Sequence, residues 1–329
     1  MKTKKLSLFK ILGILLALSL LCALPPATAT AASYPTKLLR IIAPYSPGGP
    51  SDTLGRLIAT ALSERLGVQV LLENRPGAGA VIGTELAAKS KPDGYTLLIV
   101  TGGHTVQPAF HKIPYDPAKS FTALARVGTG PFVLTVHSSV PATSVKEFIA
   151  LAKQKPGELV FASSGAGAST HIATELFKIT ADIDFKIVQF KGAGPAVIDE
   201  VGGHSQASIL SLITPLPHIK SGKLRALATC GAKRSALLPD VPTVAETLPG
   251  FEISQWYGML APAGLPTPIV ERLANEFKEI LNSEDMKKRF LMQGVEAEYM
   301  GLAEFGPFLE NDVAKWKAVV KKANIRLDK

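Results

Sequence analysis

The chain has few of the residues that form covalent or metal cross-links. It has only two cysteines, Cys22 and Cys230, in 329 residues, and Cys22 lies in a segment that we expect to be removed. This leaves Cys230 without a disulfide partner, and we expect it to be a buried thiol in the apolar run Leu224–Cys230. The six histidines lack the paired spacing of metal ligands. We therefore predict no metal and no cofactor.

Charge is also sparse, since charged residues make up 19% of the chain. The 36 Lys and Arg residues outnumber the 27 Asp and Glu residues, which gives a net charge of +9. The basic residues are scattered, without the basic and aromatic clusters of nucleic-acid binding proteins, so we predict no nucleic-acid partner. A modest positive bias is compatible with a small acidic ligand and equally with a solvated surface.

The sequence lacks a long apolar run apart from Ile11–Leu24, a stretch of fourteen residues that follows four lysines. This run is shorter than the roughly 20 residues of a spanning helix, and small residues follow it at 27–32. The pattern is typical of a cleavable signal peptide, so we predict export to the periplasm or another extracytoplasmic compartment. Leu21 is bulky where a lipoprotein signal needs a small residue, which argues against lipid anchoring at Cys22. Removing the four leader lysines lowers the net charge to +5.

The most informative segment is Ala43–Asp52, a glycine-rich turn between the apolar run Leu38–Ile42 and the helical pattern Thr53–Leu66. The first N–H groups of a helix have no partner inside the helix, and the helix dipole adds partial positive charge at that end. The turn is therefore typical of an anion site, although glycine and proline also build turns for conformational reasons alone. A second such unit follows, with Leu159–Phe161 before the turn Ala162–Thr170. Two such turns, far apart in the chain, predict a cleft between two lobes.

Strand-like runs alternate with helical stretches through the rest of the chain. The predicted strands are Leu39–Ala43, Val68–Leu72, Thr96–Val100, Val133–Val136, Leu159–Phe161, Phe185–Val188, Ala207–Leu210 and Arg225–Thr229. Repeated units of this kind predict an α/β fold with parallel sheets and helices on both faces. We predict a signal peptide at 1–32, a first lobe at 33–132 and 228–329, and an inserted second lobe at 133–227. The chain would then cross between the lobes near 125–136 and again near 225–234.

Nine motifs, in order along the predicted mature chain, resemble the substrate-binding proteins of tripartite tricarboxylate transporters, the Bug family. They are Pro44–Asp52, Glu73–Gly79, Lys91–Tyr95, Pro114–Pro117, Ser163–Gly165 with His171, Lys191–Ala196, Gly202–His204, Leu216–Arg225 and Trp256–Gly264. The resemblance implies a type II periplasmic-binding fold with a ligand cleft between two α/β lobes. It also implies that backbone N–H groups and small hydroxyls of two opposed turns bind a carboxylate, rather than a buried arginine.

Carried over residue by residue, the resemblance places ligand-binding groups in both turns and in three flanking segments. The first turn supplies Tyr45, Ser46, Gly48, Gly49, Ser51 and Asp52, and the second supplies Ser163, Ser164, Gly165, Ser169, Thr170 and His171. The flanking candidates are Thr101, Gly102 and His104 at a strand end, Lys191, Gly192 and Gly194 in a third glycine turn, and Trp256 in an apolar strand pattern.

Several candidates also have a purely structural interpretation. Asp52 is expected to accept backbone N–H groups at its own helix rather than to face an anion, or else to accept from a ligand amino or hydroxyl group. A neutral His171 would support its turn or touch the ligand. Lys191 is as compatible with a solvated surface as with binding, and an aromatic in a strand, such as Trp256, is more often core.

The function we predict is capture of a small carboxylate by a monomeric extracytoplasmic protein and its delivery to the membrane subunits of a tripartite tricarboxylate-type transporter. Leu210 and Ser211 stand where many relatives have an acidic or amide residue, which favours an acid with a simple apolar tail. A binding protein that reports to a membrane sensor kinase would share these features. A serine hydrolase using Ser163 or Ser164 with His171 is a remote alternative, because the sequence has no Gly-x-Ser-x-Gly elbow.

Overall fold

The computed structural model describes residues 34–110, 112–322 and 325. The chain divides into two units, Met1–Thr36 and Lys37–Lys329, and the fold below is that of the second unit. The predicted signal peptide lies outside the described residues. Across the described ranges, no helix has both the length and the apolar character needed to cross a membrane.

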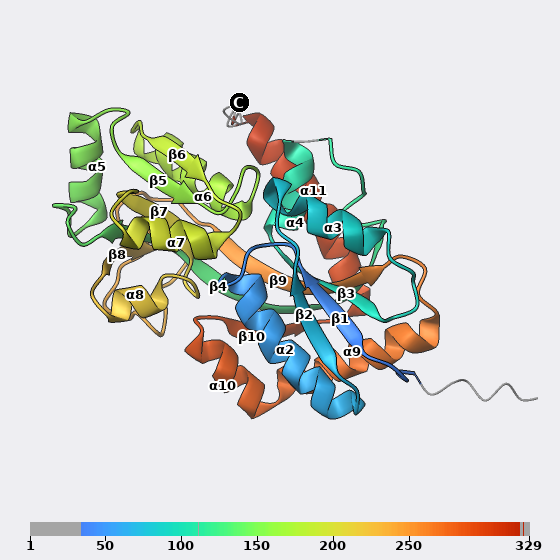
Figure 1. The fold of residues 1–329 in the computed structure, drawn as a ribbon. Helices are drawn as coiled ribbons and strands as arrows, with labels where there is room; N and C mark the ends of the chain where they lie inside the picture. The colour runs from blue at the N-terminus through green and yellow to red at the C-terminus, as the bar shows by residue number, and fades with distance from the viewer. Residues whose placement is uncertain (1–33, 111, 323–324, 326–329) are drawn as a thin grey trace, which may run out of the picture. The chain divides into compact units, whose positions relative to one another are not determined.

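The strands form one continuous mixed sheet in the order β2-β1-β3-β9-β4-β7-β5-β6, with β8 and β10 also paired to β4 (Figure 1). Their bounds are β1 Leu39–Ala43, β2 Val70–Asn74, β3 Thr96–Thr101, β4 Phe121–His137, β5 Val160–Ser163, β6 Lys186–Gln189, β7 Ala207–Ser211, β8 Leu224–Thr229, β9 Ser254–Pro262 and β10 Glu296–Met300. All six residues of β3 are buried, as expected for a strand that is covered on both faces.

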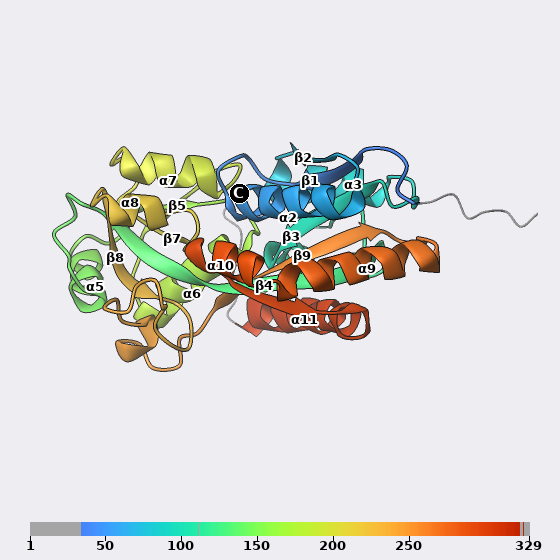
Figure 2. The ribbon, with the colours of Figure 1, turned by 90° about the horizontal axis from the view of Figure 1, so that it is seen from below.

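Strand β4 joins two halves of the sheet, which are the two lobes. It pairs with β9 and β10 along its first part and with β7 and β8 along its second part, and Figure 2 shows it running through both halves. The first predicted crossing, near 125–136, therefore falls within this strand. The prediction of parallel sheets is wrong in part, because the pairings of β4 with β7, β8, β9 and β10 are antiparallel, as is that of β3 with β9.

Helices cover both faces of each half (Figure 2). Their bounds are α2 Pro50–Leu66, α3 Val81–Ala88, α4 Gly103–Val106, α5 Val145–Gln154, α6 Ser169–Ala181, α7 Ala193–Val201, α8 Leu216–Lys220, α9 Thr267–Asn282, α10 Glu284–Met292 and α11 Leu302–Lys322, with short 3-10 turns at Ala78–Ala80, Gln107–Ala109 and Val244–Glu246. Helix α2 begins with proline at its first position and ends at Gly67 with φ +67°, a left-handed conformation that glycine adopts without steric cost.

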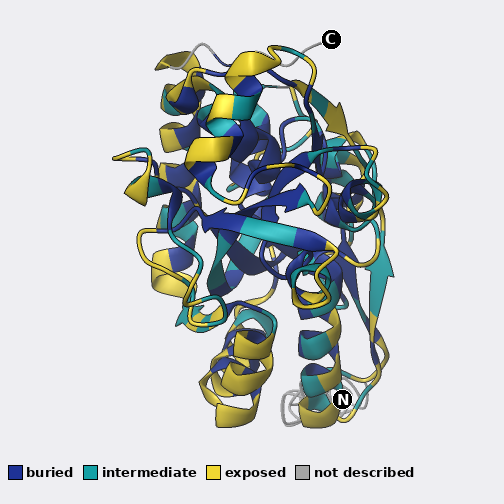
Figure 3. Ribbon diagram, turned by 90° about the vertical axis from the view of Figure 1, so that its left-hand side faces the viewer, coloured by how far each residue is buried: buried dark blue, intermediate teal, exposed yellow. Residues whose placement is uncertain are grey.

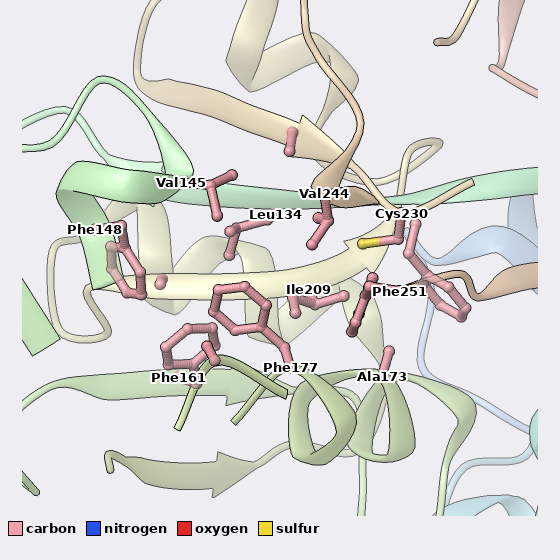
Figure 4. Close-up of a cluster of buried hydrophobic side chains, with 14 of the residues drawn as sticks. Leu134, Val145, Phe148, Phe161, Ala173, Phe177, Ile209, Cys230, Val244 and Phe251 are labelled. Carbon is pink, nitrogen blue, oxygen red and sulfur yellow. The ribbon is translucent and has the colours of Figure 1, made fainter. Parts of the chain in front are cut away.

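The largest apolar cluster lies in the second lobe. Phe148, Phe161 and Phe177 pack together with ring centroids 5.6 to 6.4 Å apart, and Cys230 lies fully buried beside Val244 and Phe251 (Figure 4). Burial raises the pKa of the Cys230 thiol, so this cysteine remains neutral in the core. Exposed residues lie on the outer faces of the helices and in the loops (Figure 3).

The segment after β8 makes contacts with the second lobe. The Cys230 N–H donates to the Phe132 carbonyl at 2.8 Å, and the Ile253 N–H donates to the Cys230 carbonyl at 2.9 Å. Val244, Phe251 and Ile253 belong to the apolar cluster of that lobe. We therefore propose that the chain returns to the first lobe at Ser254, where β9 begins, and the remaining lobe boundaries stay a prediction.

Candidate functional site

A small cavity lies between the two lobes, at the point where the glycine turns face each other. Its volume is about 20 Å³, which is room for about one water molecule. It is lined by Tyr45, Pro50, Ser51, Thr101, Ser164, Ser169, Thr170, Ala193, Ser211 and Gln255. None of these described residues is charged. We call this space the interlobe cavity.

Three helix N-termini meet at the interlobe cavity. Pro50 and Ser51 begin α2, Ser169 and Thr170 begin α6, and Ala193 begins α7. The preceding residues, Gly49, Ala168 and Gly192, make no side-chain capping hydrogen bond. Because each helix presents N–H groups and about half a positive charge at this end, the cavity favours an anion even without a basic side chain.

The hydroxyl of Ser51 is buried without a hydrogen-bond partner among the described residues. The residue is 1% exposed and lines the interlobe cavity. A buried hydroxyl without a partner costs free energy. Such a group at the start of a helix is therefore a donor available to a bound acceptor.

The second turn carries a hydroxyl network centred on Thr170. Thr170 Oγ1 accepts from the Ser164 N–H at 3.1 Å and lies 2.7 Å from Ser164 Oγ and 3.2 Å from Ser163 Oγ. All three residues are buried, but Ser164 and Thr170 line the cavity and Ser163 does not. Ser163 thus supports the turn from behind.

The opposite wall is formed by Tyr45 and Thr101 of the first lobe. Burial raises the pKa of the Tyr45 phenol, and a hydrogen bond with the Thr101 side chain acts in the opposite direction. The phenol is therefore neutral and retains its proton. It adds a polar group to the cavity without adding negative charge that would repel an anion.

Four of the lining residues were not predicted as ligand-binding: Pro50, Ala193, Ser211 and Gln255. Gln255 donates through Nε2 to Ser169 Oγ at 2.7 Å and accepts through Oε1 from the Gly102 N–H at 2.8 Å. The hydroxyl of Ser211 lies 2.5 Å from the Tyr257 hydroxyl. Side chains alternate between the two faces of a strand, so a pattern that places Trp256 in the core also points Gln255 and Tyr257 the other way.

Asp52 holds its own turn. Its Oδ2 accepts from the Gly48 N–H at 3.1 Å, and its Oδ1 lies 2.9 Å from the Arg56 guanidinium one helical turn on. The carboxylate is thus held by one hydrogen bond at Oδ2 and one ion pair at Oδ1, and it does not line the cavity. Of the two glycines of the turn, Gly48, with φ +81°, is exposed and Gly49 is buried.

His171 supports the second turn, and its position does not favour a serine hydrolase. Its Nδ1 accepts from the Gly167 N–H at 3.1 Å, its Nε2 lies 3.6 Å from Glu175, and its ring stacks on Phe110. The hydroxyls of Ser163 and Ser164 are directed to Thr170 instead. His171 and Gly165 do not line the cavity.

The flanking candidates lie further from the cavity. His104 donates through Nε2 to the Pro117 carbonyl at 2.7 Å, and burial lowers the pKa of its imidazole to about 4. Trp256 packs between Phe305 and Phe308, and its indole N–H donates to Asp312 at 3.1 Å. The Lys191 side chain is exposed. None of these, nor Gly102, Gly192 or Gly194, lines the interlobe cavity.

Backbone contacts join the lobes around the cavity. Ser46 donates to the Lys191 carbonyl through its N–H at 3.1 Å and through Oγ at 3.0 Å. A Cβ on Gly194 would overlap the Pro47 carbonyl oxygen, and one on Gly103 would lie 3.2 Å from the Ser169 backbone nitrogen of the other lobe. These glycines therefore permit the close approach of the two lobes.

A larger pocket of about 570 Å³ lies on the other side of the Gln255–Ser169 pair. Its walls include α6, α11 and the chain segment 250–256, and it contains both cationic and acidic side chains, among them Arg126, Glu252 and Lys315. We call it the hinge pocket. It shares only Gln255 and Ser169 with the interlobe cavity, so this pair separates the two spaces.

The chain is similar to proteins of known sequence and structure. A family model described as "Tripartite tricarboxylate transporter family receptor" matches residues 54–325. Protein BugT of Bordetella pertussis is 35% identical over 308 residues, which span 92% of this chain and 94% of that protein. The solved structure of R. palustris Rpa4515 with adipate is 34% identical, with a TM-score of 0.87, and the match covers 89% of this chain and 99% of that one.

MatC (Rpa3494) from Rhodopseudomonas palustris, solved with bound malate, is 29% identical, with a TM-score of 0.83, and the match covers 87% of this chain and 100% of that one. The predicted two-lobed fold, similar to that of type II periplasmic binding proteins, is confirmed by these likenesses.

Proposed function

The chain belongs to the tripartite tricarboxylate transporter receptor family, and we propose from this and from the geometry that it captures a small organic carboxylate in the interlobe cavity. Relatives in the family are solute-binding receptors, so the protein is a receptor rather than an enzyme. The observation that carries the proposal is the meeting of three uncapped helix N-termini, with small hydroxyls, at one cavity lined by no charged side chain among the described residues.

This design suits a carboxylate that must be released again. Hydrogen bonds from rigid N–H groups to a carboxylate are charge-assisted, and they require little reorganisation when the turns are already formed. Two relatives were solved with the dicarboxylates adipate and malate, which supports a dicarboxylate here. Leu210 is buried, and Ser211, which lines the cavity, carries only a small hydroxyl, which favours a ligand with a simple apolar tail.

Capture requires that the two lobes move apart and close again. The interlobe cavity, at about 20 Å³, is smaller than any dicarboxylate, so a ligand enters only when the contacts between Ser46 and Lys191 separate. A carboxylate that contacts both turns then stabilises the closed arrangement through contacts that exist only there.

We further propose that the protein is exported, acts as a monomer and delivers its ligand to the membrane subunits of a tripartite tricarboxylate-type transporter. The family description supports the transporter as partner, and the N-terminal pattern of lysines, apolar residues and small residues supports export. Delivery is tested by uptake of the labelled acid in cells with and without the gene. Unchanged uptake together with loss of an acid-dependent transcriptional response would instead favour the sensory role.

Binding is tested by thermal unfolding of the purified protein with adipate, malate, citrate and benzoate, each paired with its uncharged amide. A ligand at 100 times its Kd stabilises the folded state by about 2.7 kcal/mol. We expect at least one acid to raise Tm in a concentration-dependent manner and its amide to have no such effect. If no acid raises Tm, or if amides act equally well, the carboxylate proposal fails.

A further inference from the structure

We propose that Gln255 is a positioning residue that fixes the Ser169 hydroxyl as a hydrogen-bond donor toward the ligand, and thereby helps the cavity select head groups that only accept hydrogen bonds. The inference rests on the proposed function and goes beyond it, because it assigns carboxylate selectivity to a side chain of the strand β9 rather than to the glycine turns alone.

The orientation of the Gln255 amide follows from its partners. A backbone N–H can only donate, and the Gly102 N–H is shared between the Gln255 amide oxygen at 2.8 Å and the Trp256 carbonyl at 3.1 Å, so the amide oxygen rather than the amide nitrogen faces it. The amide nitrogen therefore faces Ser169 Oγ at 2.7 Å and donates to it. Gln255 is 3% exposed, so water does not compete for either bond.

The orientation of the Ser169 hydroxyl follows in turn. Its oxygen accepts from Gln255, so the hydroxyl hydrogen is free to donate elsewhere. Ser169 is buried, begins α6 and lines the interlobe cavity. A bound carboxylate oxygen would accept this hydrogen and the N–H groups of the same helix turn together.

The first lobe presents a matching donor. Ser51 begins α2 and lines the same cavity with an Oγ that has no protein partner within the described chain. A carboxylate accepts hydrogen bonds at both oxygens, whereas an amide or ammonium group presents N–H donors. Donors from both lobes can therefore bond to the two oxygens of an acid. The N–H groups of an amide or ammonium would instead face these donors, which would then have no acceptor.

The Gln255–Ser169 pair also separates the interlobe cavity from the hinge pocket, because it contributes to the walls of both. Loss of the amide would remove the fixed orientation of the hydroxyl and open the site to the water of a space of about 570 Å³. Both effects weaken the preference for an acid over an amide without removing any contact in the glycine turns.

The test is a double-mutant cycle with Q255M, S169A and the double variant, each compared with the purified wild-type protein. The probe is adipate or malate, whichever the wild type binds more tightly, together with the corresponding diamide. Calorimetry gives the Kd of the acid, and competition gives that of the diamide. The matched control is Q154M, because Gln154 is an exposed glutamine near the end of α5.

We expect Q255M to lower the acid-over-amide preference by about tenfold, which is the size of one hydrogen bond to a charged group. S169A should lower it by a similar factor, and the double variant by no more than either single change, because both remove the same donor. Q154M should leave the preference unchanged. A preference that is intact in Q255M, or effects that multiply in the double variant, would overturn the inference.

Q255E provides a second test that preserves side-chain shape and the bond to Gly102. Its other oxygen would accept from Ser169 and turn the hydroxyl away from the ligand, and its negative charge would repel an anion, so we expect acid affinity to fall by more than about thirtyfold in the variant that remains folded. Retained acid preference in Q255E counts against the inference. If the wild type binds neither acid, it is the proposed function that fails.

Discussion

The Ser51 hydroxyl should favour ligand binding without stabilising the unliganded fold. This buried hydroxyl has no partner among the described residues, so it adds nothing to the unliganded fold, yet it is available to a bound carboxylate. We expect S51A to weaken acid binding roughly tenfold to a hundredfold, the range of a hydrogen bond to a charged group, while Tm without ligand stays the same or rises. Calorimetry and thermal unfolding measure the two effects.

The control for this change is S221A. Ser221 is exposed, its hydroxyl donates to the His218 carbonyl at 3.2 Å, and it lies far along the chain from the turns. S221A should change neither the acid affinity nor the Tm without ligand. A fall in Tm for S51A would show that the hydroxyl has a structural partner, and unchanged acid binding would remove it from the site.

Glu200 makes the stability of the second lobe depend on pH. It is fully buried, its Oε2 accepts from Ser208 at 2.7 Å and from Thr135 at 3.1 Å, and burial raises the pKa of its carboxyl from 4.5 to about 7. In the unfolded chain the group ionises at its ordinary value, so ionisation favours unfolding as pH rises between these two values. A shift of this size corresponds to about 3 kcal/mol.

E200Q should therefore gain stability relative to the wild type as the pH is raised from 5 to 8, by up to about 3 kcal/mol over the range. Urea unfolding at several pH values measures the difference. E64Q, at an exposed position of α2, should give a curve parallel to that of the wild type. Parallel curves for E200Q as well would mean that Glu200 is ionised in the folded protein.

At the scale of elements, the approach of helix α7 to the first turn controls closure. A Cβ on Gly194 would overlap the Pro47 carbonyl oxygen and come within 3.4 Å of Gly48, and these are backbone atoms that cannot yield easily. We expect G194A to weaken acid binding by about tenfold or more while leaving the unliganded fold intact, because the added methyl opposes only the closed arrangement. Small-angle scattering with ligand should show a more open particle than the wild type.

G306A is the matched control, because Gly306 lies within α11 and an added Cβ there meets no atom within 4 Å. Replacing a helical glycine by alanine stabilises by about 1 kcal/mol or less and should not alter binding. If G194A binds the acid as tightly as the wild type, the close contact between the lobes is not part of the bound state.

Elements with a local signal were predictable, and pairings set by distant parts of the chain were not. Strand β1 was predicted from its apolar run with its bounds as observed, and the glycine turns were predicted from their position between a strand and a helix. Strand β4 is much longer than the predicted Val133–Val136, because its first part is fixed by pairing with β9 and β10. These antiparallel partners lie more than a hundred residues further along the chain, so the local hydrophobic periodicity of β4 gives no sign of them.

In the candidate site, too, a residue whose role depends on distant partners was not predicted. The family resemblance implied that Tyr45, Ser51, Thr101, Ser164, Ser169 and Thr170 bind the ligand, and the structure brings them around one cavity, although their contact with a ligand stays a prediction. Gln255 was missed because its importance depends on two partners, Gly102 and Ser169, that are distant in sequence. Only the fold brings these three residues together.

At the scale of the whole second unit, the two lobes are coupled in ways that make independent unfolding unfavourable. Strand β4 belongs to both halves of the sheet. In addition, Trp316 and Val320 of α11 join the apolar cluster of the second lobe, while Phe305 and Leu309 of the same helix join a cluster of the first. One helix and one strand thus each contribute to both cores.

This coupling predicts a single cooperative unfolding transition, and the chain's two tryptophans can report on it separately. Trp256 belongs to the first lobe's cluster and Trp316 to the second's, so W316F and W256F each leave one fluorescent reporter. Within each variant, the fluorescence midpoint in urea should coincide with the far-ultraviolet circular dichroism midpoint, because two-state unfolding makes all probes agree. If the midpoints of either variant separate, the lobes unfold independently, and closure is then a docking of two separately stable bodies rather than a bend within one.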